Sequence, residues 1–277
     1  MKNYRILNYG FLLTCMVGYG CAPLKEVNQF ASSCQQSLAK ASFTGYGYYG
    51  YCYDSCYTFN RSGKFLVDFD CDCSYAHRLD TLISREYGIL SDYFAALARL
   101  SGSETTIDFA PVAGAISEGS YGNITITAQE SGAVNRLAKV ATDLFTEKYK
   151  SKKIKEIILT YNDTLKIAME LLKLHLDNLR SKIQLMGTEL QLRSDLLMAR
   201  AQTDAEKFAV VYVYKQRSRE LAGVIPAFDR QYEALDKMQK GHMELYSKIG
   251  ELRSESLRKS VLDLARDIHY LSDNTKN

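Results

Sequence analysis

The chain has 277 residues, of which 46% are hydrophobic and 24% charged, and its formal net charge is +3. Ordinary apolar content with a small net charge excludes a disordered chain, and the length allows one large domain or two small ones. The charge is also too small for a dedicated nucleic-acid binder, which usually carries clustered Arg and Lys.

The first 20 residues have the features of an export signal. Lys2 and Arg5 form a short basic region, residues 6–18 are largely apolar, and no acidic residue occurs in this segment. An apolar run of about 13 residues is too short to cross ~30 Å of hydrocarbon as a helix, which favours a signal peptide over a membrane-spanning anchor. Removing residues 1–20 leaves 33 basic and 32 acidic residues, a net charge of +1.

The junction Val17-Gly18-Tyr19-Gly20-Cys21 resembles the lipobox of bacterial lipoproteins, in which the Cys becomes the lipidated first residue of the mature chain. The resemblance covers only these first 21 residues. It implies lipidation of Cys21, and the alternatives are a plain secretory signal or a buried N-terminal helix. Because Ala22 rather than Asp follows the Cys, the resemblance also implies the outer membrane of a Gram-negative bacterium.

Residues 21–102 are predicted to form a lipid-anchored cap that is rich in Cys and Tyr. Apolar residues at helical spacing predict one helix over about 24–41 and another that begins near Ser74 and ends at Ser101-Gly102. Because this cap begins at the expected lipid anchor, we expect the membrane to be the first partner of the chain.

A β-hairpin is expected inside this cap, because the runs 53–59 and 64–73 flank a turn cluster. In that register Cys52 faces Cys71, and cross-strand Cβ atoms ~4.5 to 5.5 Å apart approach disulfide geometry. An oxidising envelope permits such bonds. We expect Cys52–Cys71 first, and the candidates for a second bond are Cys56–Cys73 and Cys34–Cys56.

The same cysteines offer a second chemistry, a zinc site built from Cys52, Cys56, Cys71 and Cys73 with His77 nearby. Zinc sites favour two to four residues between paired cysteines, and only one residue separates Cys71 from Cys73. We therefore predict disulfides, no metal and no cofactor.

Two surface features are candidates for interaction. Tyrosine offers an amphipathic contact at low entropic cost, so the Tyr-Gly stretch predicts a carbohydrate or protein recognition loop, with packing on the hairpin as the alternative. A lysine-rich segment over 148–155 is able to attract anionic lipid or polysaccharide, with a solvated helix joint as the alternative. The residues concerned are Tyr46, Tyr48, Tyr49, Tyr51, Lys150, Lys152 and Lys153.

Residues 103–130 are predicted to be a connector. The alternating segment 123–127 suggests a short strand, and the apolar, Gly-containing run 109–116 suggests a tongue that dips into a membrane interface without crossing it.

Residues 131–277 are predicted to be a bundle of long helices. A stripe from Ile154 to Leu190 steps by threes and fours, which is typical of a long amphipathic helix. Gly187 could kink this helix, and Thr203 with Glu206 resembles a capping box that starts a new one. The pattern leaves open whether residues 131–222 form one, two or three helices.

We expect Gly223 to end this helical region and Pro226 to begin a last helix of ~45 residues, antiparallel to the one before it. The predicted fold class is therefore mainly α, an elongated antiparallel helical bundle or coiled coil, with a small Cys-rich N-terminal cap containing a β-hairpin.

No catalytic constellation emerges from the sequence. The four histidines are dispersed, and His175 and His242 occupy apolar stripe positions typical of core histidines. The predicted function is a lipid-anchored cell-envelope structural or interaction protein that is not an enzyme, with an envelope protein or polysaccharide as its partner. The alternative is a membrane-active helical protein of the pore-forming type that inserts residues 107–128.

Overall fold

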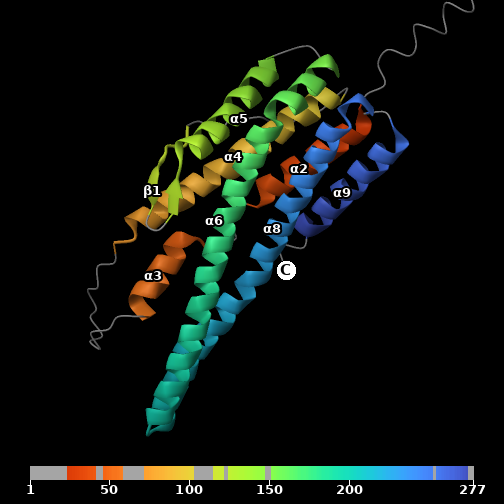
Figure 1. Cartoon of the computed structure of the whole chain (residues 1–277). Coiled ribbons are helices and arrows are strands. Elements are labelled where there is room, and N and C mark those ends of the chain that lie inside the picture. The colour runs from red at the N-terminus through yellow and green to blue at the C-terminus, as the bar shows by residue number, and fades with distance from the viewer. Residues whose placement is uncertain are drawn as a thin grey trace, which may run out of the picture.

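The computed structural model of the protein describes residues 24–41, 46–58, 72–102, 115–121, 124–146, 151–251 and 254–273. The described part of the chain is mainly helical, as predicted (Figure 1). The helices are α2 (Lys25–Lys40), α3 (Tyr48–Thr58), α4 (Ser74–Ser101), α5 (Ala128–Thr146), α6 (Ser151–Arg200), α7 (Asp204–Val210), α8 (Gln216–Ser247) and α9 (Glu255–Asp273), with a π-helical segment over Val211–Lys215 and a 3-10 turn over Ile249–Glu251.

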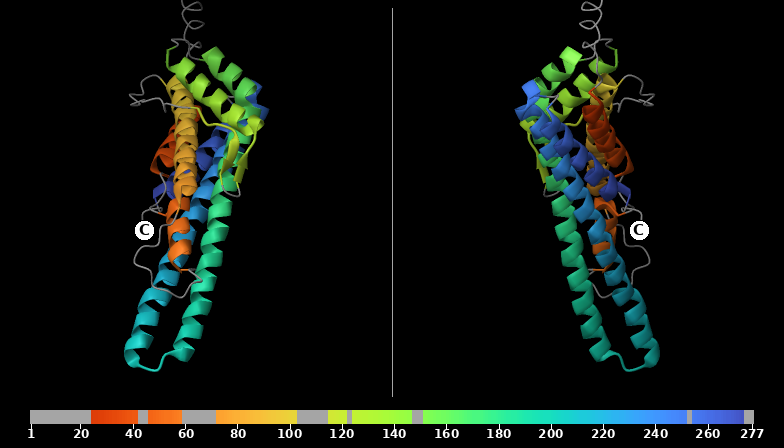
Figure 2. Two further views of the ribbon diagram at one scale, coloured as in Figure 1. Left: turned by 90° about the vertical axis from the view of Figure 1, so that its left-hand side faces the viewer. Right: turned by 90° about the vertical axis from the view of Figure 1, so that its right-hand side faces the viewer.

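The helices form a bundle from which one antiparallel hairpin extends (Figures 1 and 2). Helices α2, α4, α5 and α9 pack with the adjoining parts of α6 and α8 around one continuous apolar core. Beyond their contacts with α3, the two long helices pack only against each other and against the short segment that joins them. We call residues 183–218, which make up this extension, the arm.

The bundle forms because its helices bury stripes at helical spacing. In α2 the buried positions Val27, Phe30, Cys34 and Leu38 face α4 and α9, as the predicted 24–41 helix required. Helix α4 is the central element, since almost every residue from Ile89 to its end is buried.

The predicted hairpin over 53–73 is wrong in its first strand, because residues 48–58 form helix α3. Most of the second run lies outside the described residues. The two-stranded hairpin that the structure contains pairs β1 (Gly119–Tyr121) with β2 (Ile124–Ile126) in antiparallel register, which confirms the short strand expected within 123–127. Ile124 and Ile126 are buried, so this hairpin covers part of the core.

The joint between the long helices is not at Gly223, and that prediction is wrong. Helix α8 runs through both Gly223 and Pro226 without ending. Its buried stripe continues across them, from Leu221 to Phe228, so packing against α6 offsets the local cost of Gly and Pro.

The chain instead reverses at residues 201–203, where a capping box begins α7. Thr203 Oγ1 accepts the backbone N–H of Glu206, and the Glu206 carboxylate accepts the N–H of Thr203 at 3.0 Å. The expected capping box is confirmed, while Gly187 lies inside the unbroken helix α6.

The single last helix of ~45 residues that the sequence predicted is divided into two. Helix α8 ends at Ser247, and α9 folds back along α8, where Lys237 Nζ and Asp267 Oδ2 are 2.9 Å apart.

Candidate functional site

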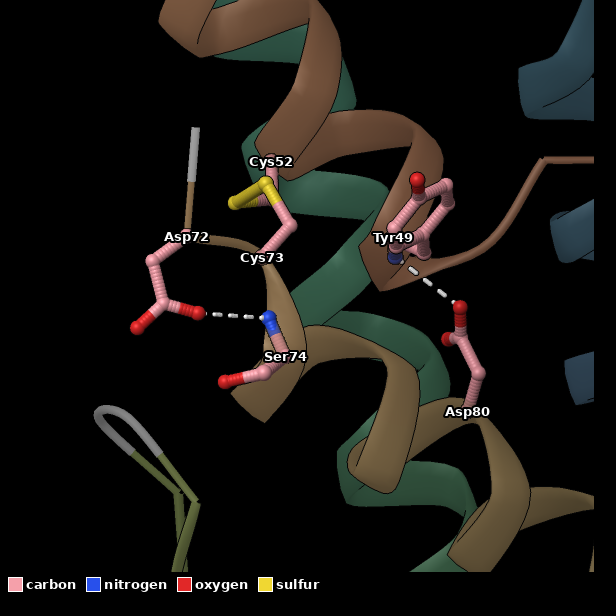
Figure 3. Close-up of a disulfide and its surroundings, with 6 residues drawn as sticks. All are labelled: Tyr49, Cys52, Asp72, Cys73, Ser74 and Asp80. Atoms are coloured by element: carbon pink, nitrogen blue, oxygen red, sulfur yellow. Dashed lines mark hydrogen bonds between the residues drawn. A yellow bond between two sulfur atoms is a disulfide. The ribbon is translucent and has the colours of Figure 1, made fainter. Parts of the chain in front are cut away.

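The cysteines form a staple that joins α3 to the start of α4 (Figure 3). Cys52 is bonded to Cys73, with their Cα atoms 5.8 Å apart, so the predicted Cys52–Cys71 pair is wrong, as is Cys56–Cys73. The register behind those pairs assumed a strand where the chain is helical. Cys56 is disulfide-bonded as well.

The remaining cysteine predictions divide between contradicted and untested ones. Cys34 is a free thiol buried in α2, which rules out Cys34–Cys56, and burial raises the pKa of this thiol well above its usual value. The zinc alternative is wrong, because Cys52 and Cys73 are bonded to each other rather than available as thiolates. Cys21 and Cys71 lie outside the described residues.

Helix α3 is docked on α4 by its N-terminus. The carboxylate of Asp80 accepts the backbone N–H groups of Tyr48 at 2.7 Å and Tyr49 at 2.9 Å, which caps the helix (Figure 3). Burial raises the pKa of Asp80 and the two N–H donors partly oppose that rise. A Cβ atom at Gly47 would overlap this carboxylate, so only glycine allows the approach.

Helix α3 also contacts the base of the arm. The Tyr48 hydroxyl donates to the backbone oxygen of His175 in α6 at 2.9 Å. Asp54 pairs with Arg217 near the start of α8, and Lys182 of α6 lies 5.3 Å from the ring centre of Tyr51. These contacts tie α4, α6 and α8 together where the bundle ends.

The candidate tyrosines therefore have different environments. Tyr46 and Tyr48 are buried, and Tyr46 donates its hydroxyl to Asp54 at 2.7 Å. Tyr51 is partly buried against the core, whereas Tyr49 is exposed and stacks with Tyr53.

The lysine-rich segment is described only in part. Lys150 lies outside the described residues, and nothing is described of the Lys152 side chain. Lys153 forms an ion pair with Glu156 at 3.3 Å on the surface of α6.

The two stripe histidines are buried in the core, as predicted. His175 Nδ1 and Glu86 Oε2 form a hydrogen bond at 3.0 Å, and burial raises the pKa of Glu86. His242 accepts from the Tyr93 hydroxyl at 2.8 Å and contacts Asn162 at 3.3 Å. Burial lowers the pKa of His242 to about 3, so this imidazole is neutral at physiological pH.

These buried groups have the residue types of an acid–base site but no access to a substrate. Glu86 and His175 are 1% and 0% exposed. A small pocket does open among α2, α4, α8 and α9, but the lining that the structure describes for it contains no carboxylate, histidine or cysteine. A general acid or base must reach the proton that it transfers, and neither histidine meets this condition here.

The arm carries the most conspicuous surface of the molecule. On α6, Leu185, Leu192 and Leu196 are exposed, with Leu192 at 59%, and we call these three residues the leucine flank. On the helical segment that returns from the apex of the arm, Phe208 and Tyr212 are 71% and 62% exposed, with ring centroids 6.1 Å apart. We call this pair the aromatic flank.

The apex of the arm between these flanks is polar. Residues 200–207 read RAQTDAEK, and Asp204 and Glu206 in the first turn of α7 are exposed. The apolar surface therefore covers the sides of the arm and not its end.

The sequence contains a signal for this surface that the apolar stripes do not reveal. Residues 208–214 read FAVVYVY, which is apolar all round when placed on a helix, and such a segment is normally buried. Here it lies in a two-helix hairpin that is able to cover only one of its sides.

No protein-family model, no curated protein and no solved structure matches the chain. None of the described helices is both long and apolar enough to cross a membrane.

Proposed function

We propose that the protein is a lipid-anchored interaction protein of the cell envelope, without catalytic activity, and that the arm is its binding element. The observation that carries this proposal is the apolar surface on the sides of the arm. Large side chains such as Phe208 and Leu192 keep more than half of their surface in water, and Phe208 stacks on the exposed Tyr212. Grouped exposed apolar side chains are typical of a site that another molecule covers.

The position of the start of α2, the first described helix after Cys21 in the chain, agrees with this role. Arg258, near the start of α9, pairs with Glu26 in the first turn of α2, so α2 begins at the end of the bundle where α8 ends and α9 starts. The arm extends from the opposite end of the same long helices (Figure 2). A lipid on Cys21 would then place the membrane at one end of the rod and the arm at the other.

The distance covered supports the same interpretation. Helix α6 has 50 residues, which at 1.5 Å per residue is about 75 Å. A protein held at a membrane by one end of such a helix would present its binding surface well away from the lipid.

The alternative function is membrane activity through residues 107–128. Ile116, Ile124 and Ile126 of this segment are buried against the bundle, so insertion would require them to leave the core. Residues 107–114 lie outside the described part of the chain. Release of a dye from liposomes by micromolar protein would favour this alternative, and intact liposomes would remove it.

The experiment that tests the arm is site-specific photocrosslinking of the full chain in its native envelope. A photoreactive phenylalanine analogue replaces Leu192 on the leucine flank, and in a matched variant it replaces Leu159, which is half exposed on the bundle portion of the same helix. We expect a crosslinked product from position 192 and none from position 159. Absence of a product at position 192, or equal products at both, would overturn the proposal.

The anchor needs its own control. Replacing Cys21 with Ala should abolish labelling by a fatty-acid analogue, and continued labelling would refute the lipid attachment.

A further inference from the structure

The two flanks of the arm lie on opposite outer sides of the hairpin. Each leucine of the leucine flank follows a buried residue by two positions, Leu185 after Ile183, Leu192 after Leu190 and Leu196 after Ser194. Two positions turn an α-helix by about 200°, so these leucines point directly away from α8. Phe208 and Tyr212 likewise precede the partly buried Val210 and Tyr214 by two positions.

The parts of the two flanks nearer the apex are also level with each other along the arm. The Ser218 hydroxyl donates to the backbone oxygen of Gly187 at 3.1 Å, which sets these two residues opposite one another. Counting five to nine residues from this pair toward the apex reaches 192–196 on α6 and 209–213 on the returning helical segment. Leu192 and Leu196 are therefore level with Tyr212, with Phe208 one residue nearer the apex and Leu185 on the bundle side of the Gly187–Ser218 pair. One copy carries two different apolar surfaces that face outward in opposite directions.

The charges of the two surfaces are complementary. Residues 184–199, which carry the leucine flank, contain Glu189, Asp195 and one basic residue, Arg193. Residues 207–219, which carry the aromatic flank, contain no acidic residue and four basic ones, Lys207, Lys215, Arg217 and Arg219. Lys207 and Arg217 are already paired within the chain, with Asp204, Asp54 and Glu220, so Lys215 and Arg219 are the cations that this segment offers to Glu189 and Asp195 of another copy.

The polar apex argues against two other occupants. Asp204 and Glu206 at the end of the arm, and Arg200 and Lys207 beside them, would have to be dehydrated if the arm entered a bilayer end-on. A partner that caps the end would leave both flanks exposed to water. Lateral packing of helices covers the flanks and keeps the apex in solvent.

We propose that arms of neighbouring copies pack side by side, the leucine flank of one copy against the aromatic flank of the next. This inference rests on the proposed function and names its partner as a second copy of the chain. Because the two contacting surfaces differ, the contact is heterologous, and its repetition produces a ring or a row of molecules rather than a closed two-fold dimer.

The test uses two double variants of the full chain, each expressed with two different tags and extracted from membranes in mild detergent. The first, Leu192→Lys with Leu196→Lys, removes the part of the leucine flank that is level with the aromatic flank, and the second, Phe208→Lys with Tyr212→Lys, removes the aromatic flank. All four side chains are exposed, so the fold of the monomer should persist, which circular dichroism checks.

The heterologous contact gives a distinctive pattern of co-purification. Wild type should recover wild type, and each double variant should recover itself at least about tenfold less, since one of the two surfaces is missing from every copy. A mixture of the two variants should regain association as pairs, because the intact aromatic flank of the first meets the intact leucine flank of the second. Replacing the bundle residues Leu159 and Tyr270 with Lys should leave recovery unchanged.

Other results would overturn the inference. Self-association that survives loss of one flank but not of the other would indicate an isologous contact. Wild-type copies that do not recover one another would exclude the second copy as partner. A photocrosslink from position 192 to a different protein would then retain the proposed function while removing this inference, and no crosslink at all would remove both.

Discussion

The bundle and the arm are made from the same two helices, α6 and α8, and differ in what surrounds them. In the bundle α6 packs against α4 and α5 as well as α8, so both its inner and lateral positions are covered. In the arm only the helical segment that returns from the apex covers α6, and the leucines on the other side of α6 remain in water. A long amphipathic helix therefore needs more than one neighbour to bury most of its apolar residues, since even in the bundle Leu159 and Leu174 of α6 stay half exposed, and the arm lacks the others.

The two regions also differ in their polar interior. The bundle encloses Glu86, His175 and His242, whose side chains are nearly inaccessible. Many of the charged residues of the arm are at the surface, including Asp195, Asp204 and Glu206. Stability of the bundle should therefore depend on pH more strongly than that of the arm.

The largest expected effect is a fall in the free energy of unfolding at acid pH. His242 has a pKa of about 3 in the folded bundle and about 6.5 when unfolded, so the unfolded chain binds the extra proton between these values. The contribution of neutral His242 to the free energy of unfolding is complete above pH 6.5 and is lost as the pH falls toward 3. At pH 4 the loss is roughly 3 kcal/mol. Urea unfolding at pH 7, 5 and 4 should show this loss in the wild type and a smaller one in His242→Gln.

Comparison with the variant is needed because other groups titrate in this range. Glu86, whose pKa is raised by burial, contributes with the opposite sign, since it favours the folded state more as the pH falls. Equal pH dependence in wild type and His242→Gln would show that the histidine does not become charged on unfolding.

Removing the staple between α3 and α4 should have the next largest effect. The bond closes a separation of 21 residues, and a loop of this size corresponds to about 3 kcal/mol of unfolding free energy. Because Cys56 is disulfide-bonded as well and its bond remains, Cys52→Ala with Cys73→Ala should lose at most this amount in urea unfolding. Cys34→Ala, which removes a buried thiol without removing a crosslink, should cost less, and a reversed order would show that α3 is held chiefly by its noncovalent contacts.

Two glycines offer the smallest and most local test. Replacing Gly with Ala should change the free energy of unfolding in opposite directions in the bundle and in the arm. A Cβ atom at Gly241 would overlap the ring of Phe30, which is fully buried in the bundle, so Gly241→Ala should cost about 1 to 3 kcal/mol. Nothing lies within 4 Å of the corresponding position at Gly187 in the arm, so Gly187→Ala should stabilise the helix by about 0.5 to 1 kcal/mol. Urea midpoints that shift in the same direction would contradict the contrast.

Local signals in the sequence predicted much of the helical framework. The stripes over 24–41 and 74–101, the capping box at Thr203 and the burial of His175 and His242 all agree with the structure. These features depend on residues within one or two turns of one another, so the pattern in the chain is sufficient to specify them.

The candidate site was less predictable, since its features depend on residues distant in sequence. The runs of aromatic residues near Tyr53 favoured a strand, but Asp80 caps the segment as a helix and the bond to Cys73 holds it there. Which cysteine bonds to Cys52 followed from that docking and not from spacing.

The amino-acid sequence by itself determined that the chain forms long amphipathic helices with a capped reversal at Thr203, because periodicity and capping are local properties. Only the tertiary structure decided that α8 continues through Pro226 and that the apolar run 208–214 remains in water. A helix is broken or preserved, and a side chain covered or exposed, according to which neighbours pack against it.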